Sequence, residues 1–182
     1  MIRLKTILEQ ASSEDLVNNL LDKIKAKQFE RIGAGDNGIV YAIQGTEYVF
    51  KITRERDEFE VASVIVGRES EFTCFIPVLY VNDSEKMYIM RNAEPLPQQY
   101  KTAIDNFYTR YTKFALDMQG EVSIFDYLDA EGSRETEKTL VDFLRRLQQQ
   151  VERTGITEFD LDLDFKSENI MIYQSKMVLV DW

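Results

Sequence analysis

Residues 28–53 read QFERIGAGDNGIVYAIQGTEYVFKIT, and they contain three short runs typical of β-strands. The runs are residues 28–32, 39–43 and 47–53, and they are rich in the β-branched and aromatic side chains that favour strands. The glycine stretch GAGDNG separates the first two runs, and QGT separates the second from the third. The sequence therefore predicts three strands in succession, joined by glycine-containing turns.

The sequence around these strands predicts two helices and a strand pair. Apolar residues at helical spacing predict a first helix that begins at Ser12 or Ser13. A charged segment with apolar residues after the third strand predicts a helix of about 12 residues that ends at Gly67. Residues 76–83 and 85–91 are then expected to form a strand pair around a polar turn.

The pattern changes near residues 91–97, which hold two of the three prolines. Helical spacing of apolar and aromatic residues follows over residues 98–118 and 136–153. Residues 169–173 and 176–182 are expected to form a hairpin that closes the chain. The expected fold class is α+β, with an antiparallel sheet and one crossing helix in the first half and mostly helices in the second.

Composition excludes several classes of function. The 182 residues include 32 acidic and 22 basic residues, which gives a net charge of −10. This charge argues against a general nucleic-acid binder or a binder of anionic membranes. There is no histidine, so Ser-His-Asp and Cys-His catalysis are excluded, and so are most zinc sites. Cys74 is the single cysteine, which together with the absence of a secretory signal or a long apolar run predicts a cytoplasmic protein.

Gly33, Gly35 and Gly38 match the pattern G-x-G-x-x-G. The pattern alone could be a flexible turn, and in a dinucleotide-binding fold it would have to lead into a helix. Here it leads into a strand-like run, so it resembles the glycine loop that protein kinases place between two antiparallel strands, over the phosphates of ATP. Val40 follows at the position where that family has a valine against the adenine.

Lys51 lies on the third predicted strand, one hairpin after the glycine pattern. It could be an exposed strand lysine, but Val49 and Ile52 beside it are apolar. In protein kinases a lysine at this place contacts the α- and β-phosphates and is held by a carboxylate from the next helix. Glu58 and Glu60 are both available, and Glu60 is the expected partner because it directly precedes the apolar stretch of that helix.

Near the C-terminus, Asp164, Lys166 and Asn169 have the spacing D-x-K-x-x-N. An aspartate can accept a proton from a substrate hydroxyl, and an asparagine can bind a metal ion on the nucleotide phosphates. Asp181 follows twelve residues after Asn169, across the predicted hairpin. It stands where protein kinases have the metal-binding aspartate of D-F-G.

These motifs in this order resemble the protein-kinase-like superfamily. The resemblance is greatest to the reduced kinases that bacteriophages encode and that bacterial pathogens inject as effectors, and it covers residues 29–182. It implies a two-lobed fold with a β-rich N-lobe over residues 29–93 and a truncated helical C-lobe over residues 94–182, with ATP and Mg²⁺ between them. Residues 1–28 are then a helical extension.

The resemblance also implies roles for single residues. Lys51 would orient the phosphates and Glu60 would pair with it. Asp164 would be the catalytic base, and Asn169 and Asp181 would hold Mg²⁺.

Other positions refine or weaken the resemblance. Lys166 matches the lysine that Ser/Thr kinases use to steady the γ-phosphate, which favours a protein hydroxyl as the acceptor. Asp162 stands where eukaryotic kinases have histidine, and Trp182 stands in place of the phenylalanine of D-F-G, with no glycine after it. Because the sequence stops at Trp182, an activation loop and the later helices are not expected.

The resulting expectation is a minimal ATP- and Mg²⁺-dependent Ser/Thr protein kinase in the cytoplasm of a bacterial or infected host cell. Its partners would be a protein substrate and a host protein that completes the C-lobe, and neither a nucleic acid nor a membrane. Two alternatives stay open: a kinase-shaped binding module without transfer activity, and a small-molecule phosphotransferase.

Overall fold

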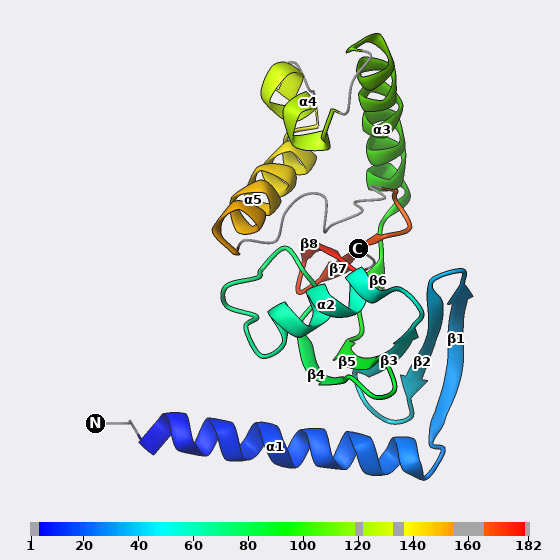
Figure 1. Cartoon of the computed structure of the whole chain (residues 1–182), viewed down its shortest axis with the longest axis vertical. Helices are drawn as coiled ribbons and strands as arrows, with labels where there is room; N and C mark the ends of the chain where they lie inside the picture. Colours follow the sequence, from blue (N-terminus) through cyan, green and yellow to red (C-terminus); the bar gives the residue numbers. More distant parts are fainter. Residues whose placement is uncertain (1–3, 119–121, 133–136, 155–165, 181–182) are drawn as a thin grey trace. The chain divides into compact units, whose positions relative to one another are not determined.

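The computed structural model describes residues 4–118, 122–132, 137–154 and 166–180 (Figure 1). The chain divides into two compact units. The N-terminal unit consists of Met1–Gly67 and Val78–Asn92, and the C-terminal unit of Arg68–Pro77 and Ala93–Trp182. The first contains an antiparallel sheet and the second contains mostly helices, which confirms the expected α+β class.

The N-terminal unit has a five-stranded antiparallel sheet with strand order β1-β2-β3-β5-β4. All five strands agree with the predicted runs. The elements of this unit, in chain order, are α1 (Leu4–Lys25), β1 (Phe29–Gly35), β2 (Gly38–Ile43), β3 (Tyr48–Thr53), α2 (Arg56–Ile65), β4 (Val78–Asn82) and β5 (Met87–Arg91).

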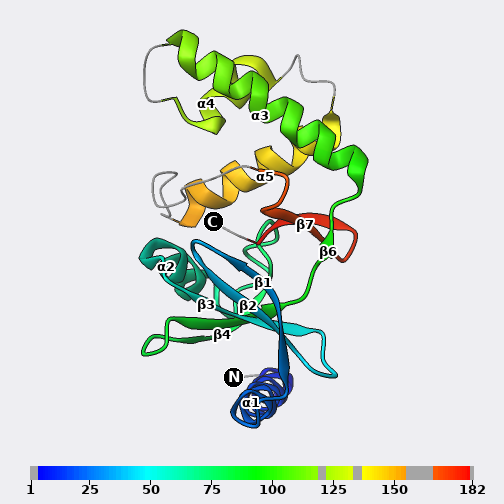
Figure 2. The same cartoon turned by 90° about the vertical axis from the view of Figure 1, so that its right-hand side faces the viewer.

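The two helices of this unit lie on opposite faces of the sheet (Figure 2). Successive strand residues point to opposite faces, and β3 shows this directly. Phe50 packs in a buried cluster with Leu20 of α1, whereas the next residue, Lys51, pairs with Glu58 of α2. The side chain of Lys51 therefore lies on the α2 face.

Helix α1 begins at Leu4, well before Ser12 or Ser13. The two serines are therefore inside the helix, and their expected role at its start was wrong. Local sequence explains the difference, because the preceding residues 4–11 contain no proline or glycine that would stop a helix.

The described residues of the C-terminal unit form three helices and a small sheet. Its elements are β6 (Glu94–Pro95), α3 (Gln98–Met118), α4 (Ile124–Glu131), α5 (Lys138–Thr154), β7 (Ile170–Tyr173) and β8 (Lys176–Leu179). The three strands pair in the order β6-β7-β8, and the three helices contact one another. The predicted helices and the closing hairpin are confirmed, including the turn at Gln174 and Ser175, which both have positive φ.

The connection between α2 and β4 belongs to this second unit. Phe75 forms an isolated parallel bridge with Leu179 of β8. The N–H of Leu179 donates to the carbonyl of Cys74 at 2.8 Å, and the N–H of Ile76 donates to the carbonyl of Leu179 at 3.0 Å. The side chain of Gln150 on α5 holds the same segment by accepting from the N–H of Cys74 at 3.0 Å.

Two elements of this unit were not predicted. Helix α4 begins with a capping box in which Ser123 and Asp126 each accept from the other's backbone N–H. The strand β6 is two residues long and includes Pro95, so its sequence reads as a linker. Among the described residues, none of the helices is both long enough and apolar enough to cross a bilayer.

Candidate functional site

Residues of the glycine hairpin and of β3 share one row across the sheet. Gly33 of β1 is opposite Val40 of β2, and Val40 is opposite Lys51 of β3. Lys51 is in turn opposite Tyr88 of β5. Directly opposed residues lie on the same face of a sheet, so this row brings three of the expected site residues together on the α2 face.

The three glycines of the hairpin differ in what the fold requires of them. A Cβ on Gly38 would lie 2.4 Å from the carbonyl oxygen of Ile52, so the approach of β2 to β3 needs glycine there. A Cβ on Gly33 would meet only the Cβ of Val40, at 3.9 Å, which is ordinary contact. A Cβ on Gly35 would meet no other atom of the described residues within 4 Å. The fold therefore explains Gly38 but neither of the other two.

Lys51 and Glu58 form a buried ion pair. The Nζ atom of Lys51 lies 2.6 Å from Oε1 of Glu58, and the two side chains are 5% and 1% exposed. The hydroxyl of Tyr88 also donates to Oε1, and the hydroxyl of Thr53 donates to Oε2 at 2.6 Å. These three donors come from β3 and β5, so the sheet binds the carboxylate that α2 presents.

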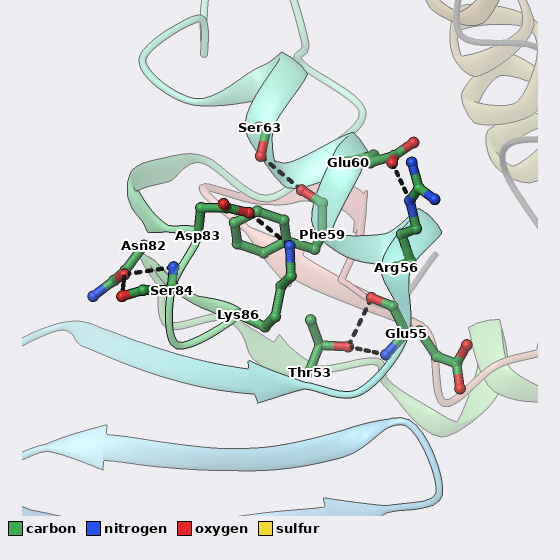
Figure 3. A network of polar contacts seen from close by, with 10 residues as sticks. All are labelled: Thr53, Glu55, Arg56, Phe59, Glu60, Ser63, Asn82, Asp83, Ser84 and Lys86. Carbon is green, nitrogen blue, oxygen red and sulfur yellow. Dashed lines mark hydrogen bonds and ion pairs between the residues drawn. The ribbon is translucent and has the colours of Figure 1, made fainter.

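Glu60 was the expected partner of Lys51, and the structure corrects this choice. Glu60 accepts a hydrogen bond from Nε of Arg56 at 2.6 Å on the exposed side of α2 (Figure 3). This bond raises the pKa of Arg56. Helix periodicity gives the reason. Glu58 precedes the buried Val61 and Ala62 by three and four residues and so shares their face, whereas Glu60 does not.

The C-terminal unit holds the remaining expected residues. Lys166 is exposed, and its carbonyl accepts from the N–H of Asn169 at 3.0 Å. The carbonyl of Asn169 accepts from the N–H of Val180 at 2.9 Å. The hairpin therefore brings Asn169 beside the residue that precedes Asp181. Asp164 and Asp181 themselves lie outside the described residues, as do Asp162 and Trp182.

The two residue types expected to bind Mg²⁺ suit that ion. An asparagine amide and an aspartate carboxylate offer the oxygen atoms that Mg²⁺ prefers. Such a site keeps several waters and phosphate oxygens among its ligands, so two side chains are sufficient. In the described part of the chain there is no group of three or more Cys, Asp or Glu residues arranged to hold a metal by itself.

Sequence reasoning missed Thr53 and Tyr88, which both bind the carboxylate of Glu58. Thr53 carried a usable signal, because it lies two residues after Lys51 and so points to the same face of β3. Tyr88 could be found only from the register of β3 against β5.

Comparison with known proteins gives a weak likeness. No family model matches the chain, and no curated protein matches it. The structure is similar to that of a choline/ethanolamine kinase family protein from Mesorhizobium loti, at 14% identity and a TM-score of 0.43. The likeness covers 90% of this chain and 64% of that one, so this chain spans less than two thirds of that protein's length. A likeness at this level assigns neither a family nor an activity.

Proposed function

We propose that this chain is an ATP- and Mg²⁺-dependent phosphotransferase that transfers the γ-phosphoryl group to a Ser or Thr hydroxyl of a protein. The observation that carries the proposal is the buried pair of Lys51 and Glu58, which lies directly beside the glycine hairpin. A lysine on the third strand, paired with a glutamate of the next helix, is the arrangement that orients ATP phosphates in protein kinases.

Stability alone is a poor explanation of this pair. Burying two charges costs solvation, and apolar side chains of similar volume are often as stabilising or more so. The same holds for Gly33 and Gly35, because alanine would fit at both positions. A ligand that needs a fixed ammonium group and a close approach to backbone N–H groups accounts for both features. A nucleotide phosphate has these properties.

The other residues supply the remaining steps. The carboxylate of Asp164 would accept the proton of the acceptor hydroxyl as its oxygen bonds to the γ-phosphorus. The bond from that phosphorus to the β–γ bridging oxygen breaks, and ADP leaves. Asn169 and Asp181 would hold Mg²⁺, which supplies charge neutralisation on the phosphates when bound.

The acceptor class rests on Lys166. This lysine follows Asp164 by two residues and is exposed, which agrees with a role in steadying the γ-phosphate of a Ser/Thr kinase. The alternative acceptor is a small-molecule alcohol, and the alternative to transfer is a binding module.

The test is transfer of radiolabelled γ-phosphate with Mg²⁺ and three sets of acceptors: generic proteins, a cell lysate and a panel of small alcohols. Wild type is expected to label itself or another protein, and Lys51→Ala and Asp164→Ala are expected to lose most of the signal. Glu60→Gln is the matched control and should keep it. Labelling of small alcohols alone would replace the protein acceptor, and labelling that persists in Asp164→Ala would overturn the assignment of the base. Wild type that labels none of the three sets would favour the binding module.

A further inference from the structure

The carboxylate of Glu58 is held by more than its lysine. Lys51 and the hydroxyl of Tyr88 both donate to Oε1, and the hydroxyl of Thr53 donates to Oε2. All four residues are buried: counted as whole residues, main chain included, Thr53, Lys51 and Glu58 are at most 4% exposed and Tyr88 is 0% exposed. A buried carboxylate needs such donors, because an oxygen that has lost its hydrogen bonds to water and gains none in the protein carries an uncompensated desolvation penalty.

The strand register places these donors together. Thr53 and Lys51 are two residues apart on β3 and therefore point to the same face. Tyr88 is directly opposite Lys51 on the neighbouring β5. Two neutral hydroxyl groups and one ammonium group thus converge on one point of α2.

Because of these hydroxyls, the position of Glu58 does not depend on Lys51 alone. If Lys51 also donates hydrogen bonds to a phosphate, its hydrogen bond to the glutamate weakens, and a glutamate bound only by that lysine would be less well fixed. Here Glu58 keeps two hydrogen bonds from the sheet. Hydrogen bonds to a charged acceptor are among the stronger ones in proteins, so both hydroxyls contribute substantially.

Thr53 also connects Glu58 with the glycine hairpin. Its Oγ1 lies 3.0 Å from the carbonyl oxygen of Asn37, in the hairpin turn. It also accepts from the N–H of Glu55 at 3.0 Å, as Figure 3 shows. The shorter distance to Glu58 assigns the hydroxyl hydrogen to that carboxylate, while the N–H of Arg54 donates to the carbonyl of Asn37 at 2.9 Å. One side chain therefore contacts the hairpin turn, the residue that precedes α2, and the glutamate of the ion pair.

We propose that Thr53 and Tyr88 are positioning residues whose hydroxyls hold Glu58 against the sheet and so keep the ammonium group of Lys51 in place. We call these four residues, Lys51, Thr53, Glu58 and Tyr88, the Glu58 lock. All four lie in the N-terminal unit. In protein kinases the corresponding pair is often made or broken by movement of the helix. In this chain the N-terminal unit itself supplies both hydroxyl donors to Glu58. The expected effect of these hydroxyls on phosphate transfer rests on the proposed function. Their effect on the position of Glu58 and Lys51 does not.

The lock can be tested by the chemical reactivity of Lys51. Acetic anhydride acylates free amines, and mass spectrometry of the digested protein compares Lys51 with exposed Lys113 as an internal reference. The double variant Thr53→Val with Tyr88→Phe removes both hydroxyls with little change in volume. We expect acylation of Lys51 to rise about tenfold, since a tenfold larger open population corresponds to about 1.4 kcal/mol.

Two variants serve as controls, and both should label Lys51 as wild type does. Thr53→Ser keeps the hydroxyl, and Tyr80→Phe removes a hydroxyl from β4 among residues that pack on the α1 side. Thermal unfolding of every variant shows that the labelled protein is folded. If the double variant does not fold, Tyr88→Phe alone is used, with an expected rise of about threefold.

Phosphate transfer gives a second and separate readout. In the double variant kcat is expected to fall about tenfold. With serine instead of valine at position 53, the share of that loss that is due to the missing Thr53 hydroxyl should be recovered. Unchanged acylation of Lys51 in the folded double variant would overturn the lock, whether or not wild type transfers phosphate. Wild type without transfer would instead refute the proposed function, and the acylation result would still decide the lock.

Discussion

Alanine at Gly35 is expected to leave the fold intact and weaken nucleotide binding, whereas alanine at Gly38 is expected to damage the fold itself. A Cβ at Gly38 would lie 2.4 Å from the carbonyl oxygen of Ile52, so β2 and β3 must move apart locally. Overpacking of this kind costs about 1–3 kcal/mol. For a chain of this size that lowers the melting temperature by about 2–12 °C.

At Gly35 a Cβ meets nothing among the described residues within 4 Å, and the backbone does not have positive φ. Alanine there restricts the unfolded chain and should leave stability unchanged or raise it by up to about 1 kcal/mol. If the hairpin covers phosphates, the added methyl group displaces a backbone N–H from a charged oxygen. Loss of one such hydrogen bond weakens the affinity for Mg-ATP by about tenfold to a hundredfold.

Thermal unfolding and isothermal titration with Mg-ATP measure the two effects on the same samples. Gly33→Ala serves as a second probe, because its Cβ also has room. Equal destabilisation at Gly35 and Gly38 would contradict the steric reasoning. Full affinity for Mg-ATP in a stable Gly35→Ala protein would contradict the assignment of the hairpin to phosphates.

Three further predictions concern single side chains. Glu58→Gln removes the counter-charge of a buried ammonium group and should lower the free energy of unfolding by about 3–5 kcal/mol. The exposed Glu60→Gln should change the free energy of unfolding by less than about 1 kcal/mol. Urea denaturation measures both variants. Gln150→Ala should cost about 1–3 kcal/mol in the same assay, since it leaves the buried N–H of Cys74 without the acceptor seen at 3.0 Å. Burial raises the pKa of the Cys74 thiol to about 11, so in native protein at pH 8 it should react slowly with a disulfide reagent and rapidly after denaturation. An unfolded thiol ionises near pH 8.5, so the unfolded chain releases this proton first and the free energy of unfolding should fall as pH rises from about 8.5 through 11.

Local patterns predicted most of the secondary structure, because the signals lie within single segments. The helix over residues 98–118 begins and ends where the apolar spacing predicts, and the strands around the glycine hairpin follow from composition and turn residues. Helix α4 was missed because it is eight residues long, too short to show a stripe of its own. Its first turn did carry a signal, the Ser123 and Asp126 capping box, which differs from the usual pattern by having Asp in place of Glu or Gln.

The choice between Glu58 and Glu60 could have been made from the sequence. Adjacency to an apolar run was the wrong criterion on a helix, where neighbours along the chain point about 100° apart. The residues three and four positions after Glu58 are the buried Val61 and Ala62, whereas the residue four positions after Glu60 is Val64, at 37% exposure. Helical spacing therefore assigns Glu58 to the face that packs on the sheet.

The partners of Glu58 could not have been predicted in the same way, because their proximity depends on strand pairing. Tyr88 is 30 residues from Glu58 in the sequence, and it reaches the carboxylate because β5 pairs with β3 in one particular register. A shift of that register by one residue would turn Tyr88 to the α1 face and Lys51 would lose its neighbour. The position of the Tyr88 hydroxyl is thus set by strand pairing in the sheet, while the glutamate that it binds belongs to a helix. This combination ties the orientation of Lys51 to the correct folding of the entire N-terminal unit.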